Sequence, residues 1–213
     1  MNDKYDTAGN IEAQFEAGSD DRVLANKLGV SNAEEMDDIE LFLMQRLYEA
    51  VLGSVESDQR LRVADIREWH RRWLGNVYVW AGQYRTLNMS KEDFVFAVGG
   101  QVPKLMDNLD KEILSVRTPC ADMSEDQLTE AIAVVHVELI LIHPFREGNG
   151  RLSRLVANVM ALQAGRQQLD YTSWDERKAD YFAAVRAGLS NDYEPMQGLV
   201  RRALREADGK QDE

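Results

Sequence analysis

The sequence predicts a mostly α-helical protein of about seven helices with one β-hairpin. Apolar residues recur every three or four positions over most of the chain, which is the spacing of helices that pack one face against a core. Serine, asparagine, proline and glycine residues interrupt this pattern where helices are expected to end. Between residues 85 and 98 the spacing changes to alternation, which is typical of strands. The chain has 213 residues, 44% of them hydrophobic, which suffices for one domain with a substantial core.

Two helices are expected before the hairpin. Ser31 has the spacing of a cap for a helix over residues 33–52. A second helix is expected over residues 64–74, where apolar side chains again share one face. Residues 1–30 are expected to form an acidic N-terminal arm and lead-in, and residues 1–21 lack periodicity and are expected to be loose.

The hairpin is expected over residues 85–98. Polar and apolar residues alternate from 86 to 90, and residues 94–98 are rich in aromatic and β-branched side chains. Residues 91–93 between these stretches are charged and suit a turn.

The remaining helices are expected after the hairpin. Ser124 and Gln127 form a capping-box pattern before a helix that is apolar nearly all round from Ile132 to Ile142, so this helix should be buried. Asn149 and Ser173 are expected to cap two later helices. The helices expected in this half span residues 101–114, 124–142, 150–164, 174–187 and 194–206.

The central helix leads into a segment of unusual chemical content, residues 143–154, which we call the motif segment. Pro144 cannot continue the incoming helix, because proline lacks an N–H group and clashes with the preceding turn. Glycines on both sides of Asn149 permit backbone conformations that other residues avoid, and they let a ligand approach the main chain. The segment is therefore expected to form a tight loop that ends at a helix N-terminus.

A loop of this kind suits anions, because free N–H groups and the positive end of the helix dipole point into it. Arg151 and Arg154 are three residues apart and project from one helix face, where guanidinium groups can bind phosphate oxygens in pairs. Glu147 can contribute a ligand to Mg²⁺, which takes its other ligands from phosphates and water. His143 is a candidate general base, since imidazole titrates near neutral pH.

The motif segment resembles the Fic-domain motif, His-x-Phe-x-(Asp/Glu)-Gly-Asn-Gly-Arg-x-x-Arg, at every fixed position. The likeness also includes Trp80-Ala81-Gly82-Gln83-Tyr84-Arg85 and the lead-in 26–40. It implies a Fic-type helical bundle over residues 31–207, followed by a flexible tail at 208–213. In this family the hairpin is a flap beside the active site.

The resemblance implies a protein adenylyltransferase, which moves AMP from ATP to a serine, threonine or tyrosine hydroxyl of a target protein with the help of Mg²⁺. His143 would be the general base that takes the proton of the hydroxyl. Glu147 would hold Mg²⁺, and Phe145 would anchor the loop in the core.

The resemblance also assigns ligands to the phosphates of ATP. Arg151 would pair with the β-phosphate and Arg154 with the γ-phosphate. The loop residues around the α- and β-phosphates would be Gly148, Asn149 and Gly150. A target segment can add to the edge of the flap as a further strand. The flap residues expected to dock the target are Lys91, Phe94, Val95 and Phe96.

Two alternatives to AMP transfer stay open at this point. A protein of the same fold can use another donor, for UMP or phosphocholine transfer, and the sequence does not reveal the shape of the base pocket. A catalytically silent nucleotide-binding module is the second alternative, although the intact His143 and Glu147 count against it. His70 and His136 are expected to be packed histidines without a catalytic role.

Inhibition is a further expectation of the resemblance. Many Fic proteins carry a Ser/Thr-x-x-x-Glu-Gly/Asn helix whose glutamate pairs with the second arginine of the motif, here Arg154. The pairs Ser31–Glu35 and Ser190–Glu194 have this spacing, but the residue after each glutamate does not fit. We therefore expect a small antitoxin partner to supply the inhibitory glutamate, with Glu35 and Glu194 as alternatives within the chain.

The composition of the chain limits the classes of protein and the compartments to which it can belong. The net charge of −12 argues against a general nucleic-acid binder. No apolar run approaches membrane-spanning length, and no signal-peptide pattern opens the chain. Cys120 is the only cysteine, so a reducing compartment such as the cytoplasm is expected, with delivery into another cell as an alternative. The target protein and the oligomeric state do not follow from these patterns.

Overall fold

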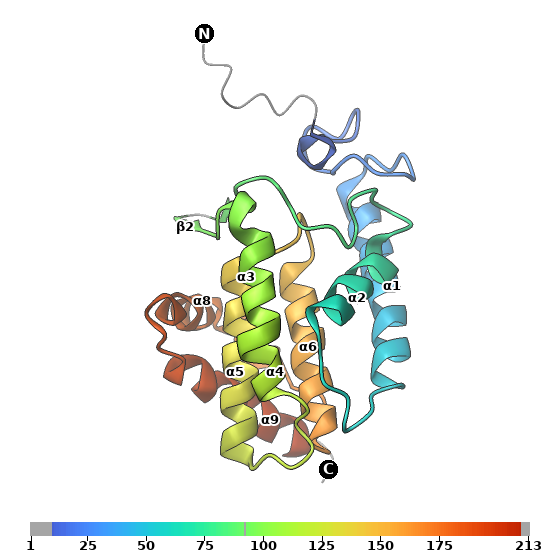
Figure 1. The fold of residues 1–213 in the computed structure, drawn as a ribbon. Coiled ribbons are helices and arrows are strands. Elements are labelled where there is room, and N and C mark those ends of the chain that lie inside the picture. Colours follow the sequence, from blue (N-terminus) through green and yellow to red (C-terminus); the bar gives the residue numbers. More distant parts are fainter. Residues whose placement is uncertain (1–9, 92, 210–213) are drawn as a thin grey trace.

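The computed structural model describes residues 10–91 and 93–209, and it confirms the predicted fold class. Helices run side by side, and a two-stranded hairpin lies near the end of the bundle at which α5 finishes (Figure 1). The helices are α1 (Ala33–Leu52), α2 (Val63–Leu74), α3 (Val102–Asn108), α4 (Ser115–Arg117), α5 (Glu125–Ile142), α6 (Asn149–Gln163), α7 (Thr172–Glu176), α8 (Lys178–Ala187) and α9 (Glu194–Gly209). The strands are β1 (Ser90–Lys91) and β2 (Phe94–Val95). A π-helical segment, Leu109–Leu114, joins α3 to α4.

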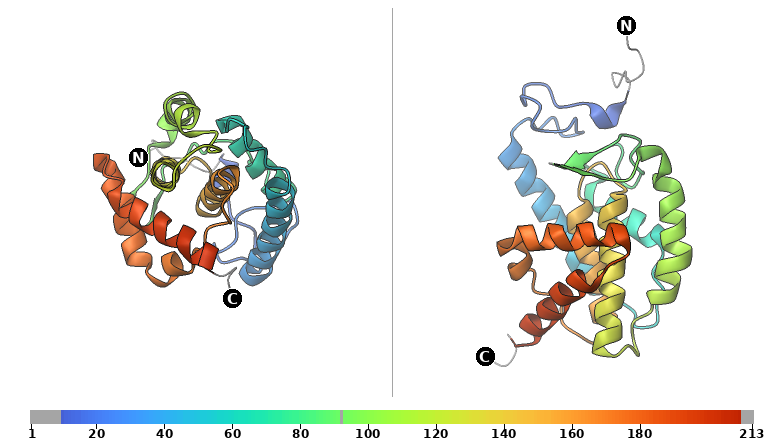
Figure 2. Two further views of the ribbon diagram at one scale, coloured as in Figure 1. Left: turned by 90° about the horizontal axis from the view of Figure 1, so that it is seen from below. Right: turned by 90° about the vertical axis from the view of Figure 1, so that its left-hand side faces the viewer.

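Helices α5 and α6 form the centre of the bundle. Seen end-on, they lie inside a ring of the other long helices (Figure 2). Ser124 caps α5 as predicted, because its hydroxyl accepts the N–H of Gln127 and the Gln127 side chain accepts the N–H of Ser124. Side chains on all faces of α5 are buried, as the apolar sequence predicts. The loop between α5 and α6 is therefore held at one end of a rigid core.

The cap of α1 differs from the prediction. Asn32, not Ser31, is the capping residue, because the Asn32 side chain accepts the N–H of Glu35 at 2.9 Å. Both residue types cap helices well, so the sequence pattern alone could not separate two neighbouring candidates.

The N-terminal arm is not loose over its described part, residues 10–21. Glu12 is buried, and its carboxylate accepts the N–H of Thr86 at 3.0 Å. The Glu12 carbonyl accepts a hydrogen bond from Nε of Arg146 at 2.8 Å. The arm is therefore fixed against the motif segment, while residues 1–9 lie outside the described part of the chain.

The hairpin is shorter than the predicted alternation. Ser90 pairs with Val95 and Lys91 with Phe94, so Lys91 lies in a strand and not in the turn. The flanking segments leave the ladder because their carbonyl groups bind the buried Arg85, which donates to those of Leu87 and Ala97. A buried cation thus replaces the neighbouring strand as the partner of these carbonyls.

The helix expected over residues 174–187 is divided. The backbone leaves the helical region at Arg177, which separates α7 from α8. Ser173 lies inside α7 and does not cap a helix, and within the described residues its buried hydroxyl has no hydrogen-bond partner. Within α7, Trp174 is buried in the core, whereas the next residue, Asp175, is exposed.

The end of the chain is helical for longer than expected. Asp208 belongs to α9 and pairs with Arg166, whereas residues 210–213 of the expected tail lie outside the described residues. Across 10–91 and 93–209, no helix combines the length and the apolar character that crossing a membrane requires.

Candidate active site

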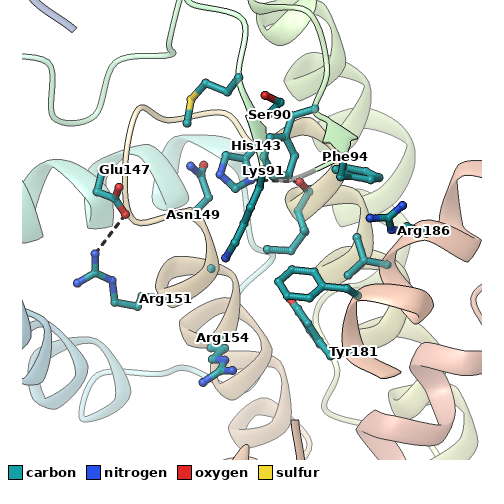
Figure 3. A pocket seen from close by; sticks show the side chains of 16 residues that line it. Ser90, Lys91, Phe94, His143, Glu147, Asn149, Arg151, Arg154, Tyr181 and Arg186 are labelled. Atoms are coloured by element: carbon teal, nitrogen blue, oxygen red, sulfur yellow. Dashed lines mark hydrogen bonds and ion pairs between the residues drawn. The ribbon is translucent and has the colours of Figure 1, made fainter. Parts of the chain in front are cut away.

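A pocket of about 470 Å³ opens where α6 begins. Its wall comes from the motif segment, the hairpin and α8, which lie far apart in the sequence (Figure 3). The predicted site residues that line it are His143, Glu147, Asn149, Gly150, Arg151, Arg154, Lys91, Phe94 and Phe96. Gly148 lies in the same loop without lining the pocket, and Val95 faces outward.

The backbone of His143 is left-handed, with φ 51° and ψ 61°, which is uncommon for a residue with a side chain. Arg85 holds this conformation. Its Nε donates to the carbonyl of His143 at 2.6 Å, and its Nη2 donates to that of Ile142 at 3.1 Å. Because Arg85 is only 1% exposed, it ends α5 from inside the protein by satisfying carbonyls that the helix leaves unpaired.

The imidazole of His143 is in the state that a general base needs. Nδ1 lies 3.3 Å from the carbonyl of Ile140, and since a carbonyl only accepts, Nδ1 carries the proton there and Nε2 is left as an acceptor. Burial lowers the pKa of His143 to about 4, with smaller contributions from the charges of Arg85 and Lys91. The ring is therefore neutral at neutral pH.

Phe145 and Asn149 close the loop that follows His143. Phe145 has no exposed surface, and its ring stacks on that of His70 with centroids 3.9 Å apart. The side chain of Asn149 accepts the N–H of Phe145 at 2.9 Å and donates to its carbonyl at 2.8 Å. Asn149 is the first residue of α6. The capping position that was predicted for Asn149 is occupied by Gly148.

Gly148 makes the tight approach of the loop to the core possible. Its φ is 83°, and a Cβ atom there would collide with the ring of Trp73. Asn149 and Gly150 line the pocket, so the first N–H groups of α6, which no preceding helical turn satisfies, are available to an anion.

His70 is the packed histidine that the sequence predicts. It is fully buried, its Nδ1 accepts the N–H of Gly82 at 2.7 Å, and its Nε2 donates to the carbonyl of Glu147 at 3.1 Å. Burial lowers the pKa of His70 to about 4, so the ring stays neutral. His70 thus braces the motif segment from behind.

Glu147 presents one carboxylate at the edge of the pocket. Its Oε1 accepts the N–H of Gly148 at 2.8 Å and lies 3.4 Å from Nη2 of Arg151. No cluster of three or more acidic, histidine or cysteine side chains able to enclose a metal occurs in the described part of the chain. A single carboxylate fits Mg²⁺ that takes most of its ligands from nucleotide phosphates and water.

Arg151 is held from two sides. Its Nη2 donates to Oε2 of Glu40 in α1 at 2.7 Å, and its guanidinium group lies 4.6 Å from the ring centroid of Trp73. Glu40 was not predicted from the sequence. The only signal was its place among apolar residues on the inner face of the predicted helix, where a carboxylate needs a partner.

Arg154 pairs with Asp175 through both terminal nitrogens, at 3.2 and 2.6 Å. Its guanidinium group lies 4.8 Å from the ring centroid of Tyr171. Glu35 and Glu194, the predicted intrachain candidates, are exposed at the starts of α1 and α9. Among the described residues, neither forms an ion pair with Arg154. Asp175 was not predicted, because no sequence pattern connects it to the motif segment.

The flap residues divide between the two sides of the hairpin. Lys91 points into the pocket, with its ammonium group 5.1 Å from the ring centroid of Phe182 (Figure 3). Phe96 is buried against His143, whereas Val95 is 69% exposed. The N–H of Phe96 donates to Met89 at 3.1 Å, so Ser90 and Val95 form a non-hydrogen-bonded pair. The N–H and carbonyl of Val95 therefore point away from the hairpin.

Helix α8 supplies the apolar wall of the pocket through Tyr181, Phe182 and Val185. The hydroxyl of Tyr181 lies 2.9 Å from Nε2 of His136 in α5, which is only 1% exposed. Burial lowers the pKa of His136 to about 3. His136 is thus a packed histidine, as predicted, and it also orients one ring of the pocket wall.

Fold and site together define a helical protein whose two central helices are joined by a loop that gathers a histidine, a carboxylate and two arginines around one pocket. The Fic/DOC family model matches residues 60–161, which include the motif segment. The chain is a member of the Fic/DOC family.

Proteins similar to this chain include named adenylyltransferases. The probable protein adenylyltransferase y4lH of Sinorhizobium fredii is 25% identical over 85% of this chain and 91% of its own length. The protein adenylyltransferase fic-1 of Caenorhabditis elegans is 30% identical over 82% of this chain. The matched region is only 33% of the length of that protein. A Fic domain of a Bartonella quintana effector, solved with bound ADP, is 25% identical with a TM-score of 0.69 and covers 89% of this chain and 92% of its own.

Proposed function

We propose that the protein transfers AMP from ATP to a serine, threonine or tyrosine hydroxyl of a target protein. The observation that carries the proposal is the neutral His143 beside Arg151 and Arg154 in one pocket at the N-terminus of α6. The names of the relatives support AMP as the transferred group over UMP or phosphocholine.

The chemical step needs one base and one leaving group. Nε2 of His143, which accepts no hydrogen bond within 10–91 and 93–209, takes the proton of the target hydroxyl. The hydroxyl oxygen then forms a bond to the α-phosphorus, and the bond between that phosphorus and the oxygen of the β-phosphate breaks. The products are the target with AMP attached and pyrophosphate, so no covalent enzyme intermediate is required.

The motif segment stabilises the charge that the leaving group gains. The N–H groups at the start of α6 bind α- and β-phosphate oxygens, while Arg151 and Arg154 bind the β- and γ-phosphates. Glu147 would hold Mg²⁺ together with the phosphates of the nucleotide, and the ion would supply positive charge against them. Arg151 and the N–H groups of α6 are fixed before substrate binds, which lowers the cost of reorganisation during reaction, whereas Arg154 has to exchange Asp175 for the γ-phosphate.

The target segment adds to the free edge of the hairpin. The outward N–H and carbonyl of Val95 supply the hydrogen bonds of strand addition, and the exposed Val95 side chain adds apolar contact. This edge lies next to Phe96, which contacts His143, so a docked hydroxyl comes near the base.

We propose further that inhibition requires a small partner protein, an antitoxin, that brings a carboxylate to Arg154. The exposed positions of Glu35 and Glu194 support a partner over an intrachain glutamate. The buried Cys120 supports a reducing compartment such as the cytoplasm.

The proposed activity is tested by incubating the chain with labelled ATP, Mg²⁺ and a cell lysate, followed by mass spectrometry of the modified proteins. We expect hydroxyl residues that carry AMP, and no modification with the His143→Ala variant. Modification by UMP or phosphocholine in matched reactions with those donors, without AMP transfer, would contradict the proposal.

A further inference from the structure

A buried carboxylate stands behind the candidate phosphate site. Glu40 lies in α1, outside the residues that the family model matches, and is 4% exposed. Its Oε1 accepts a hydrogen bond from the hydroxyl of Tyr78 at 2.8 Å. Its Oε2 accepts one from Nη2 of Arg151 at 2.7 Å. Each carboxylate oxygen therefore has its own donor.

The Tyr78 hydroxyl and the Arg151 guanidinium make the burial of Glu40 tolerable. A carboxylate away from water is costly unless charged or polar donors satisfy it. Burial raises the pKa of Glu40, and the Arg151 charge and the Tyr78 hydrogen bond oppose that rise. Burial also raises the pKa of Tyr78 far above its ordinary value, so its hydroxyl keeps the proton it donates. Arg151 is thus fixed by a carboxylate that cannot turn away from it.

Trp73 completes the cradle of Arg151. The guanidinium group lies over the Trp73 ring, and Nε1 of Trp73 donates to the Glu40 carbonyl at 2.9 Å. The same ring touches Gly148 of the phosphate loop. Trp73 therefore contacts Arg151, the loop at Gly148 and α1, and it fixes their positions relative to one another.

The orientation of Arg151 leaves donors for a ligand. Both of its carboxylate partners are bound through Nη2, and within the described residues Nε and Nη1 make no hydrogen bond. The Arg151 side chain is 38% exposed and lines the pocket, whereas the Glu40 side chain is 5% exposed. One edge of the guanidinium group is anchored inside the protein, and the rest faces the pocket.

We propose that Glu40 and Tyr78 are positioning residues that orient Arg151 toward the β-phosphate of the bound nucleotide. This inference rests on the proposed function, because it takes the pocket to be a nucleotide site. It extends the site beyond the motif segment to α1 and to the turn after α2.

The test compares two nucleotides that differ by the β-phosphate. Isothermal titration with Mg²⁺ gives the Kd of ADP and of AMP for the wild-type chain, Glu40→Gln and Tyr78→Phe. Glu40→Gln should weaken ADP binding about tenfold, the size of one hydrogen bond to a charged group, and leave AMP binding unchanged. Tyr78→Phe removes a neutral donor and should weaken ADP binding by about two- to fivefold.

A matched control comes from a second tyrosine–glutamate pair. Tyr193 donates to Glu138 at 2.6 Å, and neither residue lines the pocket. Tyr193→Phe should leave both Kd values unchanged. If Glu40→Gln fails to fold, Tyr78→Phe still decides the matter, because its ring keeps the stack on Trp80.

The outcomes are distinct. An ADP loss with constant AMP affinity in either variant supports the positioning role. Equal losses for both nucleotides, or unchanged or tighter ADP binding in both variants, would overturn it while leaving the proposed function intact. A wild-type chain that binds neither nucleotide would instead contradict the proposed function, and the positioning role with it.

Discussion

The ring of Phe96 in the hairpin stacks on the imidazole of His143, with the two centroids 3.7 Å apart and an angle of 20° between the planes. Arg85 binds the carbonyl of His143 and that of Ala97, next to Phe96. The hairpin and the candidate base are therefore one packed unit. A change on the inner side of the hairpin should disturb the base, whereas a change on its outer side should not.

The first prediction concerns the base. His143→Ala should lower AMP transfer by about 10²–10⁴-fold, the usual contribution of general acid–base catalysis. ATP affinity should change little, because the imidazole acts on the hydroxyl and not on the phosphates. Single-turnover transfer and ATP titration measure the two quantities, and transfer at the wild-type rate would remove His143 from the mechanism.

The second prediction concerns the outer edge of the hairpin. Val95→Pro removes an N–H that points away from the ladder, so it should lower modification of the target by up to about tenfold without weakening ATP binding. Phe96→Pro is the comparison, since it breaks the hydrogen bond to Met89 and removes the ring that stacks on His143, and it should reduce both target modification and ATP binding. If Val95→Pro leaves modification unchanged, the target does not add to this edge.

The third prediction concerns the metal. Glu147→Gln keeps the size of the side chain and removes its charge, so nucleotide binding should lose its dependence on Mg²⁺ and transfer should fall. Titrations of ATP with and without Mg²⁺ test this. Asp93→Asn, at an exposed ion pair of the hairpin, is a charge-matched control that should keep the dependence. A normal Mg²⁺ response of Glu147→Gln would assign the metal to another ligand.

The fourth prediction concerns pH. The chain has three histidines, and burial lowers the pKa of each well below the ordinary value of 6.5. An NMR titration of the imidazole protons in an untagged chain should therefore show no midpoint near 6.5. Transfer should be level between pH 6 and 8, because His143 is already neutral there. An imidazole that titrates near 6.5 would show that its ring is solvated.

The same histidines affect stability in a defined direction. Their lowered pKa means that the unfolded chain binds protons first, so their contribution to stability is present above pH 6.5 and is lost as pH falls toward 4. Each histidine can contribute up to about 1.4 kcal/mol per pH unit to the slope of the free energy of unfolding against pH. Urea unfolding at pH 7 and pH 5 measures the slope.

The fifth prediction concerns Arg154. If a partner supplies the inhibitory carboxylate, Glu35→Gly and Glu194→Gly should leave auto-modification at the wild-type level. A large gain of activity in either glycine variant would refute the partner mechanism.

Asp175→Asn should tighten the binding of ATP relative to that of ADP, because Asp175 and a γ-phosphate compete for the same two nitrogens of Arg154.

Local patterns predicted most of the helices. The capping box at Ser124 and the apolar faces identified α5 and the other long helices, because these signals act within a few residues of one another. The differences from the prediction are local. Asn32 replaced Ser31 as a cap, and the helix expected at 174–187 is divided at Arg177. The alternation at 85–98 shortened to a few pairs because Arg85 takes the carbonyls.

The sequence by itself determined the chemistry of the site, since a base, a carboxylate, a glycine loop and two arginines lie within twelve consecutive residues, 143–154. Tertiary structure alone decided the state of these groups. The lowered pKa of His143 comes from burial, and the orientations of Arg151 and Arg154 come from Glu40 and Asp175. Burial and ion pairing depend on which distant segments meet, and no spacing along the chain encodes that meeting.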